Sequence, residues 1–224
     1  MAKHLARDLD KLQKLILGMA RLVDEAVIRA TQALQRRDAN IAREVLVADA
    51  DIDEYENQIQ DECLKILALN QPVAGDLRRI AAVFAITTDL ERIGDLAVDI
   101  SERAIALSEV TEFPIPDKFL WLTDFVTSMV RQALEAFVNS DSRLAARVIR
   151  LDDEADRLHA EIIAEVIAAM KADPARVEAG VSLFSVTRHL ERIGDHATNI
   201  AEDVVYLVEG EIIRHRPELL KTDR

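Results

Sequence analysis

The sequence is poor in residues that interrupt helices. It has six glycines and five prolines in 224 residues, less than half of the ~12% share found in an average protein. Aromatic residues contribute only 4%, whereas half of the chain is hydrophobic and 31% is charged. So much apolar material excludes disorder, and so few turn residues argue against a β-sandwich or barrel. Long helices are the remaining prediction.

Cysteine, long apolar runs and positive charge are also scarce. Cys63 is the single cysteine, which excludes an intrachain disulfide and a zinc site built on several thiolates. The longest uncharged apolar stretch, residues 80–88, is about half of a membrane span, and the first ten residues lack the apolar core of a signal peptide. We therefore expect a soluble, cytoplasmic protein. A net charge of −13 argues against a nucleic-acid surface and favours proteins or cations as partners.

Apolar residues recur three and four positions apart along almost the whole chain, which is the pattern of amphipathic helices. Prolines and capping residues divide this pattern, and the segment 113–116, Phe-Pro-Ile-Pro, lies near the middle. The predicted helices span residues 3–37, 40–69, 73–109, 117–139, 142–171 and 174–209.

An internal repeat sets the predicted architecture. The sequence Glu-Arg-Ile-Gly-Asp at 91–95 recurs at 191–195, an offset of 100, and earlier positions of the two halves match at an offset of 103. A five-residue identity at matched places indicates duplication of a three-helix unit. We predict an all-α protein of two pseudo-symmetric three-helix bundles, with domains at residues 1–112 and 117–212 and a polar tail at 213–224.

Each copy of the motif places acidic side chains on the helix face opposite the apolar stripe. Glu91, Asp95 and Asp99 lie together in the first half. Their counterparts in the second half are Glu191, Asp195 and Asn199. An acidic stripe is commonly only a solvated surface, but carboxylates four residues apart repel each other, and both halves keep them. Each motif also has a mid-helix glycine, which predicts a close approach to the backbone at these positions.

A hard cation would relieve this repulsion, because carboxylate oxygens one helical turn apart can bind the same ion or adjacent ions. The ligand types favour Fe(III), Mn, Mg or Ca over structural zinc. The pairs Asp49/Asp53 and Asp152/Asp156 are weaker candidates, since acids at a helix start also interact well with the helix dipole. No Glu-x-x-His ligand pair occurs, and we expect the five histidines on the surface. The aromatic residues of the fourth helix are expected in the core: Phe119, Trp121, Phe125 and Phe137.

The doubled Leu-Glu-Arg-Ile-Gly-Asp motif, together with Gln-Pro-Val-Ala-Gly-Asp-Leu-Arg at 71–78, closely resembles the PhoU family over essentially the whole chain. The resemblance implies two three-helix bundles that bind metal and tend to form homodimers. Iron is the expected metal, with manganese, magnesium and zinc as alternatives, in clusters of one or several ions. Carried over by motif, the ligands are Glu91, Asp95, Asp99, Glu191, Asp195 and Asn199, and the amide at 199 predicts a weaker second site.

The resemblance further implies a non-enzymatic regulator of phosphate uptake. Its partners would be the ATPase subunit of the high-affinity phosphate ABC transporter and a sensor histidine kinase of the phosphate-starvation response, reached at the membrane through these partners only. Three alternatives stay open from the residues: an accessory protein of a low-affinity phosphate carrier, a helical-bundle metalloenzyme, and a metal-free scaffold whose acidic face binds a basic partner.

Overall fold

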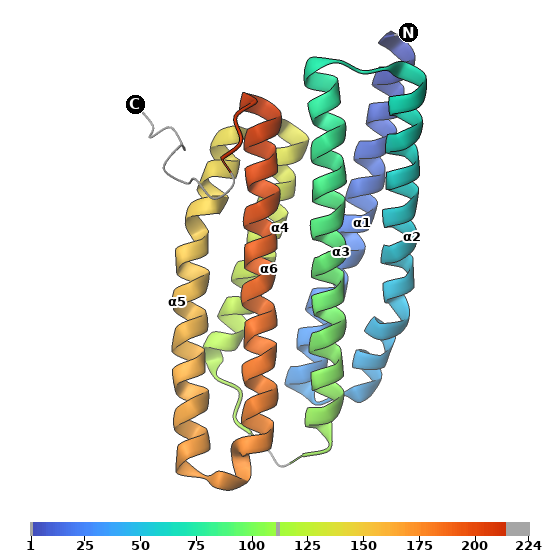
Figure 1. Cartoon of the computed structure of the whole chain (residues 1–224). Helices are drawn as coiled ribbons and strands as arrows, with labels where there is room; N and C mark the ends of the chain where they lie inside the picture. Colours follow the sequence, from blue (N-terminus) through green and yellow to red (C-terminus); the bar gives the residue numbers. More distant parts are fainter. Residues whose placement is uncertain (1, 111–112, 214–224) are drawn as a thin grey trace.

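The computed structural model describes residues 2–110 and 113–213, and side chains from residue 4 onward. Within these ranges the chain forms six long α-helices and a short 3₁₀ turn, with no strand (Figure 1). The elements are α1 (Ala2–Arg36), α2 (Ala39–Asn70), α3 (Ala74–Ser108), α4 (Asp117–Asn139), α5 (Ser142–Ala172), η1 (Pro174–Arg176) and α6 (Val177–Glu209). The predicted all-α fold is confirmed, although the segment expected as one helix over 174–209 begins with the 3₁₀ turn.

Equivalent aspartates begin the second helix of each bundle. The carboxylate of Asp38 accepts a hydrogen bond from the backbone N–H of Asn40 at 2.9 Å. Asp141 accepts two, from Arg143 and Leu144, both at 3.0 Å. Such N-caps satisfy backbone donors that the first helical turn leaves unpaired, each stabilising the helix by about 1 kcal/mol. Local chemistry therefore fixes these helix starts in both halves.

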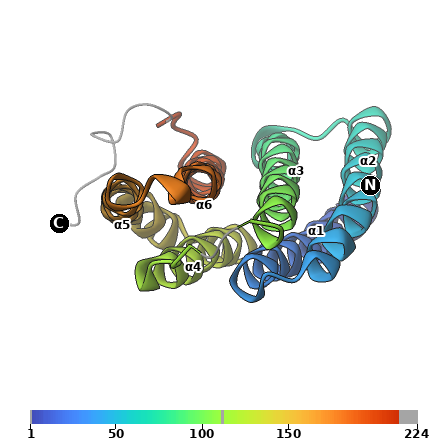
Figure 2. The ribbon, with the colours of Figure 1, turned by 90° about the horizontal axis from the view of Figure 1, so that it is seen from below.

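The helices form two three-helix bundles that stand side by side. Helices α1–α3 make one bundle and α4–α6 the other, with α3 against α6 at the centre (Figure 2). Helix α1 also approaches α4. There Arg131 of α4 donates to both carboxylate oxygens of Asp24 of α1, at 2.9 and 2.8 Å. The segment between α3 and α4, which we call the linker, is held against the end of α1. Arg37, which follows α1, donates to the carbonyls of Val110 and Phe113 at 3.4 and 3.3 Å.

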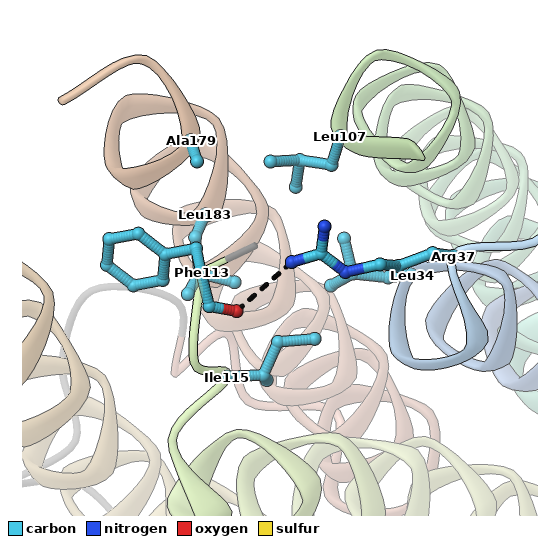
Figure 3. A pocket seen from close by; sticks show the side chains of 7 residues that line it. All are labelled: Leu34, Arg37, Leu107, Phe113, Ile115, Ala179 and Leu183. Atoms are coloured by element: carbon cyan, nitrogen blue, oxygen red, sulfur yellow. Dashed lines mark hydrogen bonds between the residues drawn. The ribbon is translucent and has the colours of Figure 1, made fainter. Parts of the chain in front are cut away.

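A small cavity lies between the bundles beside the linker (Figure 3). Its lining residues are Leu34, Arg37, Leu107, Phe113, Ile115, Ala179 and Leu183. The volume of about 10 Å³ is close to the minimum for one water molecule. This cavity therefore has no room for a substrate, although an open pocket of about 440 Å³ lies beside it and shares Arg37, Phe113 and Ile115.

Two sequence-based expectations about apolar residues have different outcomes. Phe119 and Phe137 are fully buried in the core, as predicted. The prediction for Trp121 is wrong, because this side chain is 61% exposed on the outer face of α4. The neighbouring helices cover the α4 face that carries Phe119, and position 121 lies outside it.

No described helix combines the length and apolarity that crossing a bilayer requires.

Candidate functional site

The repeated motif of the first half contributes to a group of carboxylates between α2 and α3, which we call the first acid cluster. It comprises Asp49, Asp53 and Glu56 from α2 and Glu91 and Asp95 from α3. Burial, followed by the charges of Asp53 and Asp95, raises the pKa of Asp49. Burial and Asp95 likewise raise the pKa of Glu91, with smaller contributions from Glu56 and Asp53 and against the attraction of Arg92. Like charges are thus held together in a partly dehydrated place.

The second half has a matching group between α5 and α6, the second acid cluster. It comprises Asp152, Asp156, Glu191 and Asp195, with His159 beside them. Burial and neighbouring carboxylates raise the pKa of Asp152, Glu191 and Asp195. Nδ1 of His159 is 4.0 Å from Oε1 of Glu191. At the offset of 103, His159 stands where the first half has Glu56, so the two clusters match in position but differ in charge.

The two motif glutamates are less exposed than the sequence pattern indicated, whereas the Asp95 side chain is 44% accessible and Asp195 is exposed. Only 18% of the Glu91 side chain and 25% of the Glu191 side chain are accessible. A helix wheel places these residues opposite the apolar stripe of their own helix, but α2 and α5 cover that face in the bundle. The expectation that the histidines lie on the surface is wrong for His159, His189 and His196, whose side chains are 21%, 15% and 16% exposed.

Asp99 and Asn199 make their contacts elsewhere, across the interface between α3 and α6. Oδ2 of Asp99 is 3.7 Å from Nδ1 of His189, and the amide of Asn199 donates to Asp89 at 3.3 Å. His196 also donates to Asp89, at 2.8 Å. At the offset of 100, Asp89 is equivalent to His189 and Asp99 is equivalent to Asn199. The contact of Asp99 with His189 and the contact of Asp89 with Asn199 are therefore two symmetry-related versions of one contact. The amide at 199 suits the carboxylate that faces it, independently of any metal.

The two motif glycines lie against other helices of their own bundle. A Cβ at Gly94 would be 3.2 Å from Cδ1 of Ile52 and 3.6 Å from Oδ1 of Asp49, so α2 approaches closely there. At Gly194 the nearest atom, in Val126, would be 3.5 Å away, which is an ordinary contact. The predicted close approach therefore holds for Gly94 and is wrong for Gly194.

Comparison with known proteins places this arrangement in a family. The family model described as PhoU domain matches residues 16–104 and again residues 119–204. The chain belongs to the PhoU family. It is 39% identical over 212 residues to a phosphate-specific transport system accessory protein PhoU homolog of Aquifex aeolicus, covering 95% of this chain and 96% of that protein. A similarly named protein of Pseudomonas putida is 40% identical over 209 residues, 93% of this chain and 82% of that one.

Solved PhoU structures share the fold. The crystal structure of PhoU from Pseudomonas aeruginosa has a TM-score of 0.86 and 38% identity, covering 92% of this chain and 99% of that one. The phosphate transport system regulatory protein PhoU from Streptococcus pneumoniae also has a TM-score of 0.86, at 28% identity, covering 93% and 98%. These relatives are named as accessory and regulatory proteins, in agreement with the expectation of a non-enzymatic protein.

The acid clusters contain carboxylate oxygens, the donors that hard metal ions prefer. Carboxylates from two adjacent helices meet in each cluster, and burial, followed by neighbouring carboxylates, raises the pKa of Asp49 in the first and of Glu191 in the second. Within the described residues, however, no three His, Cys, Asp or Glu side chains converge as they stand into a metal-binding group. Binding would therefore require these side chains to turn toward a common point.

Proposed function

We propose that this chain is a non-catalytic accessory protein of a high-affinity phosphate transporter that represses the phosphate-starvation response. The observation that carries the proposal is the match of both repeats, over nearly the whole chain, to proteins named for the phosphate-specific transport system. The proposal places the chain in the cytoplasm, where the transporter hydrolyses ATP.

In this role the chain links the ATPase subunit of the transporter to a sensor histidine kinase. Two bundles held side by side offer separate faces to two partners, and contacts such as Arg131 with Asp24 favour one arrangement of those faces. We infer that binding differs between phosphate-replete and phosphate-starved states, so that kinase signalling is off when phosphate is plentiful. A ligand or partner can achieve this only by binding one state more tightly than the other.

Deletion and binding experiments test this function. Deleting the gene that encodes the chain should make phosphate-responsive genes active in phosphate-rich medium. The purified chain should bind the ATPase subunit, the kinase or both. Unchanged expression together with no binding to either partner would remove the proposal. If the effect of deletion required a low-affinity carrier encoded nearby, rather than the ABC transporter, the chain would serve that carrier instead.

We also propose that the acid clusters hold metal ions. The ligands expected from the motif are Glu91 and Asp95 in the first half and Glu191 and Asp195 in the second. Asp49, Asp53, Asp152 and Asp156 lie in the same clusters and are suited to complete them. A bound cation would neutralise the repulsion between the carboxylates. Asp99 and Asn199, the third residues of the two motifs, can join only by leaving their contacts with His189 and Asp89.

Elemental analysis of protein purified without chelator tests the metal proposal. We expect at least one ion of iron, manganese, magnesium or zinc for every two chains, and loss of part of it in Glu91→Ala/Asp95→Ala. The matched variant Glu191→Ala/Asp195→Ala reports on the second cluster separately. Metal content unaltered by either variant would leave the clusters as protein surfaces. Sedimentation of the same samples, with metal bound and with metal removed, tests the expected homodimer.

A further inference from the structure

The N-terminal half of α6 carries an exposed stripe that combines apolar and basic residues. Val177, Val181 and Phe184 are 45%, 57% and 37% exposed, and Arg188 and Arg192 continue the line, both exposed. At 100° per residue these five positions fall within about 80° of one another, and they extend over about 22 Å. We call these five residues the α6 stripe. Soluble proteins seldom align large apolar side chains on a surface without a use for them.

Arg103 of α3 adds a third arginine beside the basic end of the α6 stripe. The contact of 3.7 Å between Asp99 and His189 brings these turns of α3 and α6 together, and Arg103 follows Asp99 by one turn. Arg188 directly precedes His189, Arg192 follows it by about one turn, and all three arginines are exposed. The three arginines therefore lie on exposed turns of α3 and α6 that surround this contact.

These three arginines keep their charge available. Among the described residues, none of them forms an ion pair within 4 Å, although the chain carries a net charge of −13. By contrast Arg92, which matches Arg192 in the repeat, lies 3.0 Å from Asp95 and 3.4 Å from Glu91.

The basic character is specific to this end of the interface. At the offset of 100, the positions matching Arg103, Arg188 and His189 are occupied by Asp203, Thr88 and Asp89. Both versions of the three-helix unit fold, so the packing of α3 against α6 does not itself require arginines at these places. A function outside the fold accounts for them better.

We propose that the α6 stripe and Arg103 form a docking surface for an acidic, amphipathic segment of a partner protein. Arginine and phenylalanine are enriched at protein interfaces, and the arginine fork matches a carboxylate in geometry as well as in charge. Apolar residues of the partner cover Val177, Val181 and Phe184, and its carboxylates meet the three arginines. The length of the stripe suits a partner helix of about four turns.

The identity of the partner rests on the proposed function: it is the transporter ATPase subunit or the sensor kinase encoded in the same genome. The test measures the affinity of the purified full-length chain for each of these two proteins, over a series of salt concentrations. The variant is Phe184→Ala/Arg188→Ala/Arg192→Ala. Its control, Leu77→Ala/Thr88→Ala, changes exposed positions on α3 that match Val177 and Arg188 and lie outside the acid clusters, and circular dichroism checks that both variants fold.

We expect the α6 variant to lose binding to one partner by a factor of about ten or more and to show a weaker salt dependence, because interface arginines and aromatic residues often contribute most of the affinity. The control should stay within about threefold of the parent. Unchanged partner affinity in the α6 variant would overturn the docking proposal and leave the proposed function standing. So would a variant that only loses self-association, since the surface would then belong to a second copy. If the parent bound neither protein, the proposed function would fail and the docking proposal with it.

Discussion

Replacing the motif glycines by alanine should have different effects in the two halves, although the five-residue motif is identical. In Gly194→Ala the new methyl group would lie 3.5 Å from Val126 and 3.6 Å from Ala155, at ordinary contact distances. Alanine is favoured over glycine in a helix interior by about 1 kcal/mol. We therefore expect the free energy of unfolding to rise by about 1 kcal/mol, which corresponds to about 2–4 °C in Tm for a protein of this size.

In Gly94→Ala the methyl group would be 3.2 Å from Cδ1 and 3.4 Å from Cγ2 of Ile52, which is itself buried. Overpacking a core typically costs about 1–3 kcal/mol, so the helical advantage of alanine is cancelled or exceeded. The result should lie between no change and a loss of about 2 kcal/mol. The carboxylate of Asp49, which belongs to the first acid cluster, would be 3.6 Å from the new methyl group, at an ordinary contact distance.

Urea unfolding of the metal-free protein, followed by circular dichroism, measures both effects. An Ile52→Val background provides the matched control, because it removes the Cδ1 atom that the new methyl group meets first. Gly94→Ala should be better tolerated in that background than in the parent, whereas Gly194→Ala should give the same gain in both. A clear loss of stability in Gly194→Ala, or equal effects of the two alanines, would refute this reasoning.

Three further results are expected. Because the pKa values of Glu191 and Asp195 are raised in the folded protein, their contribution to stability is favourable below their ordinary values and is lost as pH rises through the folded values. Glu191→Gln/Asp195→Asn should therefore exceed the metal-free parent in stability at pH 7 by a margin that shrinks toward pH 4 in urea unfolding; a margin independent of pH would contradict this. Asn199→Asp should cost about 1–3 kcal/mol at neutral pH in thermal unfolding, more than Asn199→Ala, because it sets a second carboxylate against the largely buried Asp89. Burial raises the pKa of Cys63 to about 12, so a thiol reagent should modify the native protein far more slowly than the urea-unfolded one, and equal rates would show that this side chain is accessible.

The helices could be predicted from the sequence because their ends depend on local chemistry. Asp38 and Asp141 cap α2 and α5. Prolines lie at or just before the starts of α3, α4 and η1. The offset between the repeats then predicted two bundles of three helices. None of these features requires knowledge of which helix packs against which.

The acid clusters could be predicted only in part, because their environment is made by other helices. The motif identified Glu91 and Asp95, but the helix wheel of α3 contains no information about α2, whose acids complete the first cluster. The same limit explains Trp121, which lies on a face that no other described helix covers. It also explains Asn199, whose amide makes sense only beside Asp89, a residue 110 positions earlier in the chain.

The unequal contacts between α3 and α6 determine which three-helix units can associate. Two copies of the first bundle, joined through the same face, would bring Asp89 of one copy against Asp99 of the other. Two copies of the second would place His189 against Asn199, without a carboxylate on either side. Each bundle thus finds its complementary contact only in the other. If the chain descends from a symmetric dimer of identical units, their fusion into one polypeptide allowed the two faces to diverge. Each half now carries the side chains that complement the other half.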